Sequence, residues 1–498
     1  MKVLYLAVEC KPFSQVGGVG DVAGELPVAL KRANRNVDIE IVTPLYGRID
    51  LPADARYVSK VRLQFHGKRE MVEIFQTVSN GVPVNFVKNQ TYFEGAYSEP
   101  YIYSDKIPFF DDALRFSFFS EACLGLIKDK HPDIVHVNDW GLGYLLARMV
   151  MENMRPRRVL TVHNIGYQGN IGKEVVKGWQ LEKILNHKSV GRAFVDPRPA
   201  WNSVNALRLG LELADRANTV SQNYCREITL PENKRTYFEG GKGLHEVTRK
   251  LHRAGRLVGI LNGYEYQFTP TDKKFKAILS EKAQLKQALG RAFTNPEAFL
   301  LGFVGRAVEQ KFKLLTERVD GKPVLQHILD IPGVNVAIIA TGLPKYERFL
   351  RKFANRPNCS ATLAFDREKA KQISLGSDVF LMPSLFEPCG ITQVESLSHA
   401  TPPLVRWTGG LVDTVKPHTA PDGTGFGFDG KNRKQLLRNL LETVNLALQL
   451  WTSNSEGFRD MQRRAFKERF LWSTSAREYI EKIYLPLLAE KPVTTNRR

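Results

Sequence analysis

Three short segments, far apart along the chain, have residue types that could act together on a phosphorylated sugar. The first, residues 14–22, is rich in glycine and lies between an apolar stretch and a helical pattern. The second places Arg306 and Lys311 just after another apolar stretch, and the third, residues 386–393, sets Glu387 shortly before a glycine. Together they predict a site with two parts, one that closes on a sugar and one that holds a phosphorylated leaving group.

The glycine-rich segment is expected to bind an anion. Gly17 and Gly18 let backbone N–H groups approach a phosphate, and the helix that follows adds partial positive charge at its N-terminus. Asp21 is expected either to cap that helix or to contact the acceptor or the sugar. A glycine turn of this kind also occurs for purely structural reasons in Rossmann-like domains, so this segment alone leaves both interpretations open.

The second and third segments predict how a leaving group and a sugar are handled. Arg306 and Lys311 would place fixed positive charge where negative charge develops on a departing diphosphate. Glu387 would accept hydrogen bonds from sugar hydroxyls and offset positive charge at the anomeric carbon. The backbone amides of the next turn, at a helix start, would meet phosphate; they belong to Gly390, Ile391 and Thr392.

Length and composition limit the class of protein. A chain of 498 residues is too long for one ordinary core and predicts two domains, and 43% hydrophobic with 25% charged residues is typical of a soluble globular protein. No apolar run reaches the roughly 20 residues that span a bilayer. The chain enters a strand pattern directly after Met1 without a cleavable leader, so we expect a cytoplasmic protein without a membrane partner.

Charge and cysteine usage exclude other classes. The net charge of +19 attracts nucleotides and phosphates, but the basic residues are spread out and no groove-reading module occurs, so nucleic acid is not an expected partner. The five cysteines are odd in number, scattered and without a Cys-x-x-Cys pair, which predicts neither a disulfide framework nor a metal site.

Apolar, β-branched runs alternate with helical patterns, which is typical of parallel α/β sheets. The first series of expected strands is 3–8, 37–42, 72–78, 82–87, 134–137, 159–162, 219–221 and 257–261. The second series is 299–304, 334–340, 362–365, 379–382 and 403–405, and amphipathic helices follow it. We therefore expect an α/β fold with two Rossmann-like domains, whose strand ends face a central cleft where ligands bind, and with C-terminal helices.

Several segments resemble bacterial glycogen synthases and plant starch synthases, retaining glucosyltransferases of the GT-B type (family GT5). Besides the segments above, the resemblance rests on residues 161–169 with His163, on Asp139 in the Asn-Asp-Trp of residues 138–140, and on Asn262 before a glycine. It extends from residue 1 to about residue 488. It implies a glycosyltransferase that uses a nucleotide sugar, ADP-glucose or UDP-glucose, and an α-glucan acceptor, and that needs no metal or other cofactor.

The resemblance also implies roles for individual residues. It gives catalytic roles to His163, Arg306, Lys311 and Glu387, and donor or substrate contacts to Gln15, Gly17, Gly18, Asp21, Asp139, Asn262, Phe365, Cys389, Gly390, Ile391 and Thr392. Phe365 would stack on the base, although a core aromatic is an open alternative. Cys389 is expected to be a spacer. The expected domains are an acceptor-side domain at 1–267, a nucleotide-sugar domain at 268–457, and helices at 458–498 that pack back on the first domain.

The sequence departs from the family in the first segment. The family has a lysine where this chain has Gln15, which removes one positive charge from the expected donor site. Lys11 or Lys313 could supply that charge instead. Two hypotheses follow: a transferase of the glycogen or starch synthase type, or a weakly active or non-catalytic relative that binds glucan or nucleotide sugar.

Overall fold

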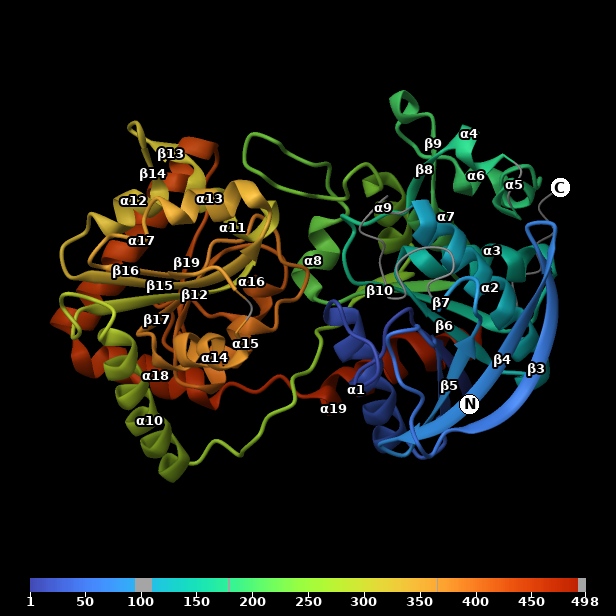
Figure 1. Ribbon diagram of the computed structural model, residues 1–498, viewed down its shortest axis with the longest axis horizontal. Helices are drawn as coiled ribbons and strands as arrows, with labels where there is room; N and C mark the ends of the chain where they lie inside the picture. Colours follow the sequence, from blue (N-terminus) through green and yellow to red (C-terminus); the bar gives the residue numbers. More distant parts are fainter. Residues whose placement is uncertain (95–109, 178–179, 365, 491–498) are drawn as a thin grey trace. The chain divides into compact units, whose positions relative to one another are not determined.

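A computed structural model describes residues 1–94, 110–177, 180–364 and 366–490. The chain forms two compact units of α/β structure (Figure 1). Unit 1 is assembled from Met1–Pro231, Gly240–Gly263 and Leu471–Arg498, and unit 2 from Glu232–Glu239 and Tyr264–Phe470. None of the helices in these described ranges is long and apolar enough to cross a membrane.

Unit 1 is built on a nine-stranded sheet with the strand order β11-β10-β7-β6-β1-β2-β5-β4-β3. The strands from β11 to β5 run parallel, and β4 and β3 continue the sheet as antiparallel neighbours. The strands are β1 (Lys2–Leu6), β2 (Asp38–Pro44), β3 (Arg56–Phe65), β4 (Lys68–Ser79), β5 (Val82–Lys88), β6 (Ile134–Asn138), β7 (Arg157–Val162), β10 (Arg216–Thr219) and β11 (Leu257–Gly259). The short pair β8 (Asn170–Gly172) and β9 (Ser203–Asn205) lies apart from this sheet.

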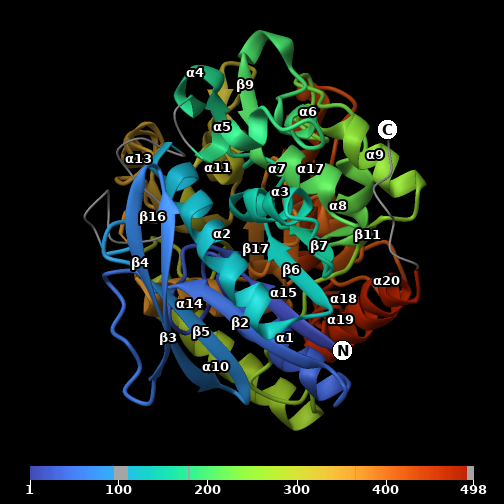
Figure 2. The ribbon, with the colours of Figure 1, turned by 90° about the vertical axis from the view of Figure 1, so that its right-hand side faces the viewer.

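Both faces of the parallel part of this sheet are buried, which explains the continuous apolar strands in the sequence. In β1, Leu4 and Leu6 pack into one core cluster with α2 (Phe110–Lys130), while Val3 and Tyr5 pack into a second cluster with α1 (Gly18–Ala33). Figure 2 shows α2 in front of the strands. The other helices of unit 1 are α3 (Gly143–Met151), α4 (Lys173–Val176), α5 (Gln180–Leu185), α6 (Gly191–Phe194), α7 (Ala206–Leu213), α8 (Gln222–Glu227), α9 (His245–Arg253), α19 (Trp472–Tyr479) and α20 (Leu485–Ala489).

The C-terminal helices complete the core of unit 1. The hydroxyl of Tyr479 accepts a hydrogen bond of 2.7 Å from Asn218 on β10, and the hydroxyl of Tyr484 lies 2.7 Å from Nδ1 of the buried His136 on β6. The helix before them, α18 (Ser455–Lys467), belongs to unit 2. The division therefore falls later than the expected one at residue 458, because Phe458 packs into the core of unit 2.

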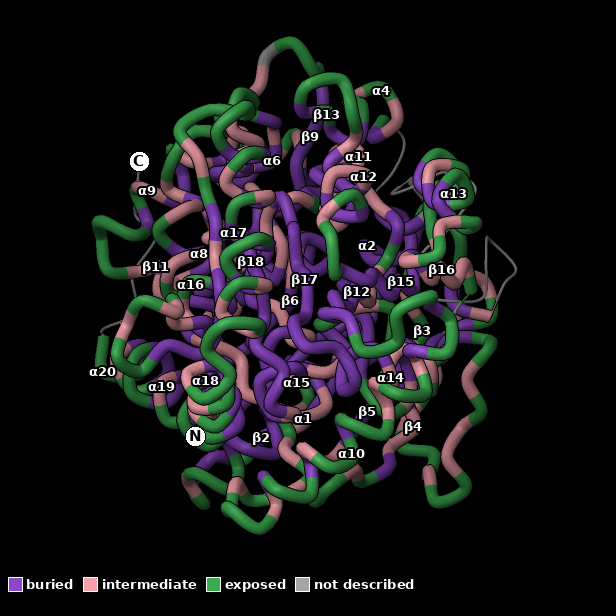
Figure 3. The backbone as a smooth tube through the Cα atoms, turned by 90° about the vertical axis from the view of Figure 1, so that its left-hand side faces the viewer, coloured by how far each residue is buried: buried purple, intermediate pink, exposed green. Residues whose placement is uncertain are grey.

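Unit 2 contains a six-stranded parallel sheet with the order β16-β15-β12-β17-β18-β19. Its central strands are almost entirely buried (Figure 3). The strands are β12 (Phe299–Ala307), β15 (Val334–Gly342), β16 (Cys359–Thr362), β17 (Val379–Met382), β18 (Pro403–Arg406) and β19 (Phe426–Phe428), with a separate pair β13 (Arg318–Val319) and β14 (Lys322–Pro323). The helices are α10 (Asp272–Gly290), α11 (Glu309–Thr316), α12 (Val324–Leu329), α13 (Pro344–Arg351), α14 (Arg367–Gly376), α15 (Thr392–Ser398), α16 (Gly410–Thr414), α17 (Arg433–Ser453) and α18.

Several strands differ from the expected ones. The structure places β16 at Cys359–Thr362 rather than at 362–365, and β10 ends at Thr219 rather than continuing to residue 221. The long edge strand β3 was not expected, because four of its six exposed positions are charged or polar and only its last residue, Phe65, is fully buried. Edge strands carry fewer buried side chains, so their apolar signal is weaker.

Candidate functional site

The expected site residues lie in two groups, one in each unit. The first half-site follows the carboxyl ends of β1, β6, β7 and β11 and comprises Glu9, Lys11, Gln15, Asp21, Asn138, Asp139, His163 and Asn262. The second half-site follows β12 and β17 and comprises Arg306, Lys311, Glu387 and residues 389–393. Parallel sheets of this kind bind ligands at the carboxyl ends of their strands.

The glycine loop of the first half-site already holds an internal anion. The carboxylate of Glu9, which is 1% exposed, accepts hydrogen bonds from the backbone N–H groups of Val16 at 2.5 Å and Gly17 at 3.0 Å. Burial raises the pKa of Glu9, although these N–H donors oppose the increase. The amide of Gly17, which the sequence offered to a phosphate, is therefore occupied, together with that of Val16, by a side chain that precedes the loop.

Gln15 and Lys11 share one partner, Asp21. The side-chain amide of Gln15 donates to Oδ2 of Asp21 at 2.8 Å, and the ammonium of Lys11 lies 3.5 Å from Oδ1 of the same carboxylate. Asp21 stands in the first turn of α1 and does not cap it, because the N-cap residue is Gly17 and no side chain bonds there. A cation is thus present beside Gln15, although it comes from four residues earlier in the chain.

His163 is buried and held as a neutral imidazole. Its Nε2 lies 2.8 Å from Oδ1 of Asn138, which also accepts from the hydroxyl of Tyr5 at 3.0 Å. Burial lowers the pKa of His163 to about 3. Since Oδ1 can only accept, Nε2 carries the proton and Nδ1 is left as an acceptor. Asn138 therefore fixes the orientation and tautomer of His163.

Asp139 holds the backbone at the end of β7, where His163 follows the strand. Its carboxylate accepts the backbone N–H of His163 at 2.7 Å, and its own backbone has a φ of +56°, a conformation that costs a non-glycine residue about 1–3 kcal/mol. Burial raises the pKa of Asp139 to about 7. A strained, partly protonated carboxyl group at a strand end is typical of a functional position.

Asn262, which follows β11, carries a side-chain hydrogen-bond acceptor without a donor in the described structure. Its side-chain oxygen is buried and has no hydrogen-bond partner among the described residues. The next residue must be glycine, since a Cβ on Gly263 would lie 2.4 Å from the backbone nitrogen of Trp472. The turn thus fixes Asn262 in place, and a sugar hydroxyl could satisfy its oxygen.

In the second half-site, the two expected motifs contact each other directly. The ammonium of Lys311 forms an ion pair with the carboxylate of Glu387, which is 7% exposed and also accepts from the hydroxyl of Ser384 at 3.3 Å. The neighbouring Gln310 donates its side-chain amide to the carbonyl of Phe386 at 2.9 Å. Cation and carboxylate are therefore held at a fixed separation by side chains on both sides.

Arg306 differs from Lys311 in that its side chain has no partner among the residues that the structure describes. Its side chain is exposed at the end of β12, and within the described part of the chain it makes no ion pair or hydrogen bond. An unpaired guanidinium keeps its five donors available for a phosphate.

Two glycines shape the backbone around Glu387. Gly390 has a φ of +79°, and a Cβ there would lie 2.3 Å from the side chain of Gln393; Gly409 has a φ of +50°, and a Cβ there would lie 1.9 Å from the carbonyl of Glu387. Gly410 donates its N–H to that carbonyl at 2.9 Å. The turn from Thr408 to Leu411 therefore packs against the backbone at Glu387 and stabilises its conformation.

The remaining expected residues lie at the start of α15. Ile391 is its N-cap without a side-chain hydrogen bond, and the hydroxyl of Thr392 contacts the sulfur of Met382 at 3.5 Å. Cys389 is buried, as are the four other cysteines, and none of these five described residues forms a disulfide bond. Phe365 lies outside the described residues. Nowhere in the described ranges do three or more His, Cys, Asp or Glu side chains gather as metal ligands would.

Sequence reasoning missed the two residues that organise the first half-site. Glu9 directly follows a strand and precedes the glycine loop, and that position was its only signal. Asn138 stands directly before Asp139 in the Asn-Asp-Trp of residues 138–140, but its bond to His163 joins residues 25 positions apart and could not be read from the sequence.

Two family models match the chain. The starch synthase catalytic domain matches residues 2–250, and the model named glycosyl transferases group 1 matches residues 292–456. Glycogen synthases from Lactococcus lactis subsp. lactis and Thermotoga maritima are each 32% identical to the chain; the first aligns with 97% of this chain and 99% of its own length, the second with 98% and 99%.

Solved structures give the same result for the fold. The catalytic domain of starch synthase IV from Arabidopsis thaliana, bound to ADP and acarbose, superimposes with a TM-score of 0.79 at 25% identity, covering 98% of this chain and 99% of that chain. A sucrose-phosphate synthase from Thermosynechococcus elongatus superimposes with a TM-score of 0.59 at 15% identity, which supports the fold alone. The expected α/β fold of the GT-B type is confirmed.

The buried titratable groups predict a change in the pH dependence of stability. Between about pH 4 and 7, Asp139 binds more proton in the folded state than in the unfolded chain, so it makes stability fall as pH rises. His163 and His136, whose pKa burial also lowers to about 3, act oppositely because only the unfolded chain protonates them below about pH 6.5. We expect Asp139→Asn to steepen the rise of unfolding free energy from about pH 5 to 7, by up to about 1 kcal/mol per pH unit.

Chemical denaturation followed by circular dichroism at several pH values measures this slope. The exposed Asp129→Asn is the control and should leave the slope of the wild type unchanged. Equal slopes for Asp139→Asn and the wild type would contradict the buried, protonated state of Asp139.

Proposed function

The chain belongs to the glycogen and starch synthase family, and from that premise we propose that it transfers glucose from ADP-glucose to an α-1,4-glucan with retention of configuration. The observation that carries the proposal is the second half-site: a fixed Lys311–Glu387 pair beside an unpaired Arg306. A protein that only binds glucan has no use for cations aimed at a leaving group, and no observation favours that alternative. The protein is therefore a glycosyltransferase.

The second half-site suits the departure of a nucleotide diphosphate. Arg306 would bind the diphosphate oxygens as charge accumulates in the transition state, and Lys311 would do so while remaining oriented by Glu387. Glu387 would accept hydrogen bonds from the glucose. ADP-glucose is favoured as donor over UDP-glucose because the similar starch synthase structure holds ADP.

The first half-site suits the transferred glucose. Neutral His163 and the orphan oxygen of Asn262 would bind glucose hydroxyls, and Asp139 would position His163 through its backbone. The acarbose in the similar structure, which is an analogue of an α-glucan, supports a glucan acceptor. An uncharged imidazole avoids repelling the positive charge that develops on the sugar ring.

The first prediction concerns Arg306. Because its side chain has no protein partner to lose, Arg306→Ala should lower kcat by about 100-fold or more with little change in the unfolding free energy. Release of ADP from ADP-glucose in the presence of glycogen measures the rate, and thermal unfolding measures stability. An unchanged rate would remove Arg306 from the site.

Lys311→Ala provides the matched comparison. It should lower kcat as well, but it should also destabilise the fold, because it leaves the buried carboxylate of Glu387 without its cation. The double variant Lys311→Ala with Glu387→Gln should recover part of that stability but none of the activity. Full stability in Lys311→Ala would contradict the ion pair.

A second prediction concerns metal ions. Since protein cations neutralise the leaving group, glucosyl transfer should persist in excess EDTA at a rate close to that of the untreated enzyme. Complete loss on chelation, reversed by Mg²⁺ or Mn²⁺, would point to a different catalytic arrangement.

A third prediction tests whether Lys11 supplies the charge that Gln15 lacks. If Lys11 contacts the donor, Lys11→Gln should lower kcat/KM for ADP-glucose by about tenfold, the lower end of what a hydrogen bond to a charged group contributes, because the side chain is partly exposed. Moving the charge, with Lys11→Gln and Gln15→Lys together, should restore most of the loss. Gln15→Lys alone should be neutral, since Asp21 already has a cation.

The outcome separates two accounts of this loop. A several-fold gain in kcat/KM from Gln15→Lys alone, with no effect of Lys11→Gln, would show that the family's charge was lost and never replaced. If neither form turns over any sugar nucleotide while glycogen still binds, the transferase proposal should be abandoned.

A further inference from the structure

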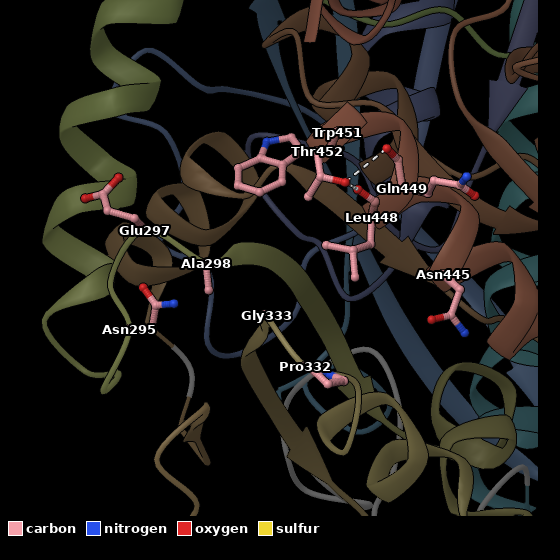
Figure 4. Close-up of a pocket in the computed structure, with 10 residues that line it drawn as sticks. All are labelled: Asn295, Glu297, Ala298, Pro332, Gly333, Asn445, Leu448, Gln449, Trp451 and Thr452. Carbon is pink, nitrogen blue, oxygen red and sulfur yellow. Dashed lines mark hydrogen bonds between the residues drawn. The ribbon is translucent and has the colours of Figure 1, made fainter. Parts of the chain in front are cut away.

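A pocket of about 450 Å³ lies in unit 2, away from the second half-site (Figure 4). Its walls come from the end of α17, from the loop before β12 and from the turn before β15. These are the amino ends of both strands, whereas the second half-site follows the carboxyl end of β12. A nine-residue strand is about 30 Å long, so the pocket and the second half-site lie at opposite ends of the strands of this sheet. The volume is within the roughly 300–1,000 Å³ range of small-molecule sites.

The pocket has the chemistry of a neutral polyhydroxylated ligand. Its polar groups are mostly amides and a hydroxyl, from Asn295, Asn445, Gln449 and Thr452. The side chains of Asn295 and Gln449 make no hydrogen bond within the described structure, so their donors and acceptors are free for a ligand. Figure 4 shows these side chains around the same opening.

The lining also disfavours nucleotides and phosphates. The chain has a net charge of +19, yet no Lys, Arg or His is among the lining residues that the structure describes, and the single charged one is Glu297. The nearby Lys286 is paired with Asp378 at 2.7 Å and lies over the ring of Trp451. An anion would therefore meet one carboxylate and no available cation.

Trp451 provides a fixed aromatic surface at the pocket. The ammonium of Lys286 lies 4.5 Å from its ring centroid, and the ring of Phe299 lies at 5.6 Å. A ring held in this way loses little conformational freedom when a ligand stacks on it. An aromatic ring beside amide groups matches a sugar, which has an apolar C–H face and hydroxyls at its edge.

We propose that this pocket is a second α-glucan-binding site, which tethers the acceptor polymer to unit 2 at a distance from the reacting end. The glucan identity rests on the proposed function, since that reaction brings the protein to a polymer with many chain segments. Binding one segment here raises the effective concentration of other segments of the same molecule. The site should therefore act on long glucans and be irrelevant for short ones.

The test compares glycogen with maltotriose, using Trp451→Ala and the double variant Asn295→Ala with Gln449→Ala. Both should raise the apparent Kd for glycogen in affinity gel electrophoresis, and the KM for glycogen, by roughly threefold to tenfold. The kcat and the KM for maltotriose should stay at wild-type values. Leu446→Ala, an exposed residue of the same helix outside the pocket, and Trp201→Ala, an exposed tryptophan in unit 1, are the controls.

The results distinguish this site from the proposed function. Wild-type affinity for glycogen in both pocket variants would overturn the site, even if the protein is a synthase. A protein that shows no transfer but loses glycogen binding in the pocket variants would retain the site without the proposed function. If Trp451→Ala does not fold, the double variant Asn295→Ala with Gln449→Ala, which changes only exposed polar residues, provides the test. An equal loss of affinity for glycogen and for maltotriose would also overturn the proposed tethering role.

Discussion

The ion pair between Lys311 and Glu387 connects two stretches of chain that are 76 residues apart and makes one site of them. Lys311 needs Glu387 to hold its ammonium in one orientation, and the buried carboxylate of Glu387 gains a partner of opposite charge. Gln310 adds a hydrogen bond to the carbonyl of Phe386, and Gly409 allows its turn to approach Glu387 closely. Most of the sequence signature of the second half-site serves this one pair, and Arg306 is left free beside it.

The first half-site contains several carboxyl groups, and each of them is stabilised in a different way. Glu9, Asp21 and Asp139 are carboxyl groups around a loop that has Lys11 as its one described basic side chain between residues 9 and 24. Glu9 is stabilised by backbone N–H groups, Asp21 by Lys11 and Gln15, and Asp139 by remaining partly protonated. Replacing lysine by Gln15 therefore changes how Asp21 is satisfied, and its effect depends on Lys11.

The sequence allowed the fold to be predicted because parallel strands were continuous apolar runs, and it placed candidate groups such as His163 and Arg306 at the ends of these strands. What could not be predicted depended on tertiary contacts. Neither the partner of Lys311 nor the bond between Asn138 and His163 follows from local spacing. The amides near Gly17 looked available for phosphate, and only the structure shows that Glu9 uses two of them.

The order of synthesis on the ribosome gives the C-terminal helices another significance. Residues 2–259 supply every strand of the large sheet in unit 1, but the hydroxyls that satisfy His136 and Asn218 come from Tyr484 and Tyr479. While unit 2 is being translated, α1 covers this face of the emerged sheet without the C-terminal helices, so part of its apolar surface is open to misassociation. The core of unit 1 can be completed only after unit 2 has been made, so the nascent chain carries an incompletely covered sheet until its last helices have been translated.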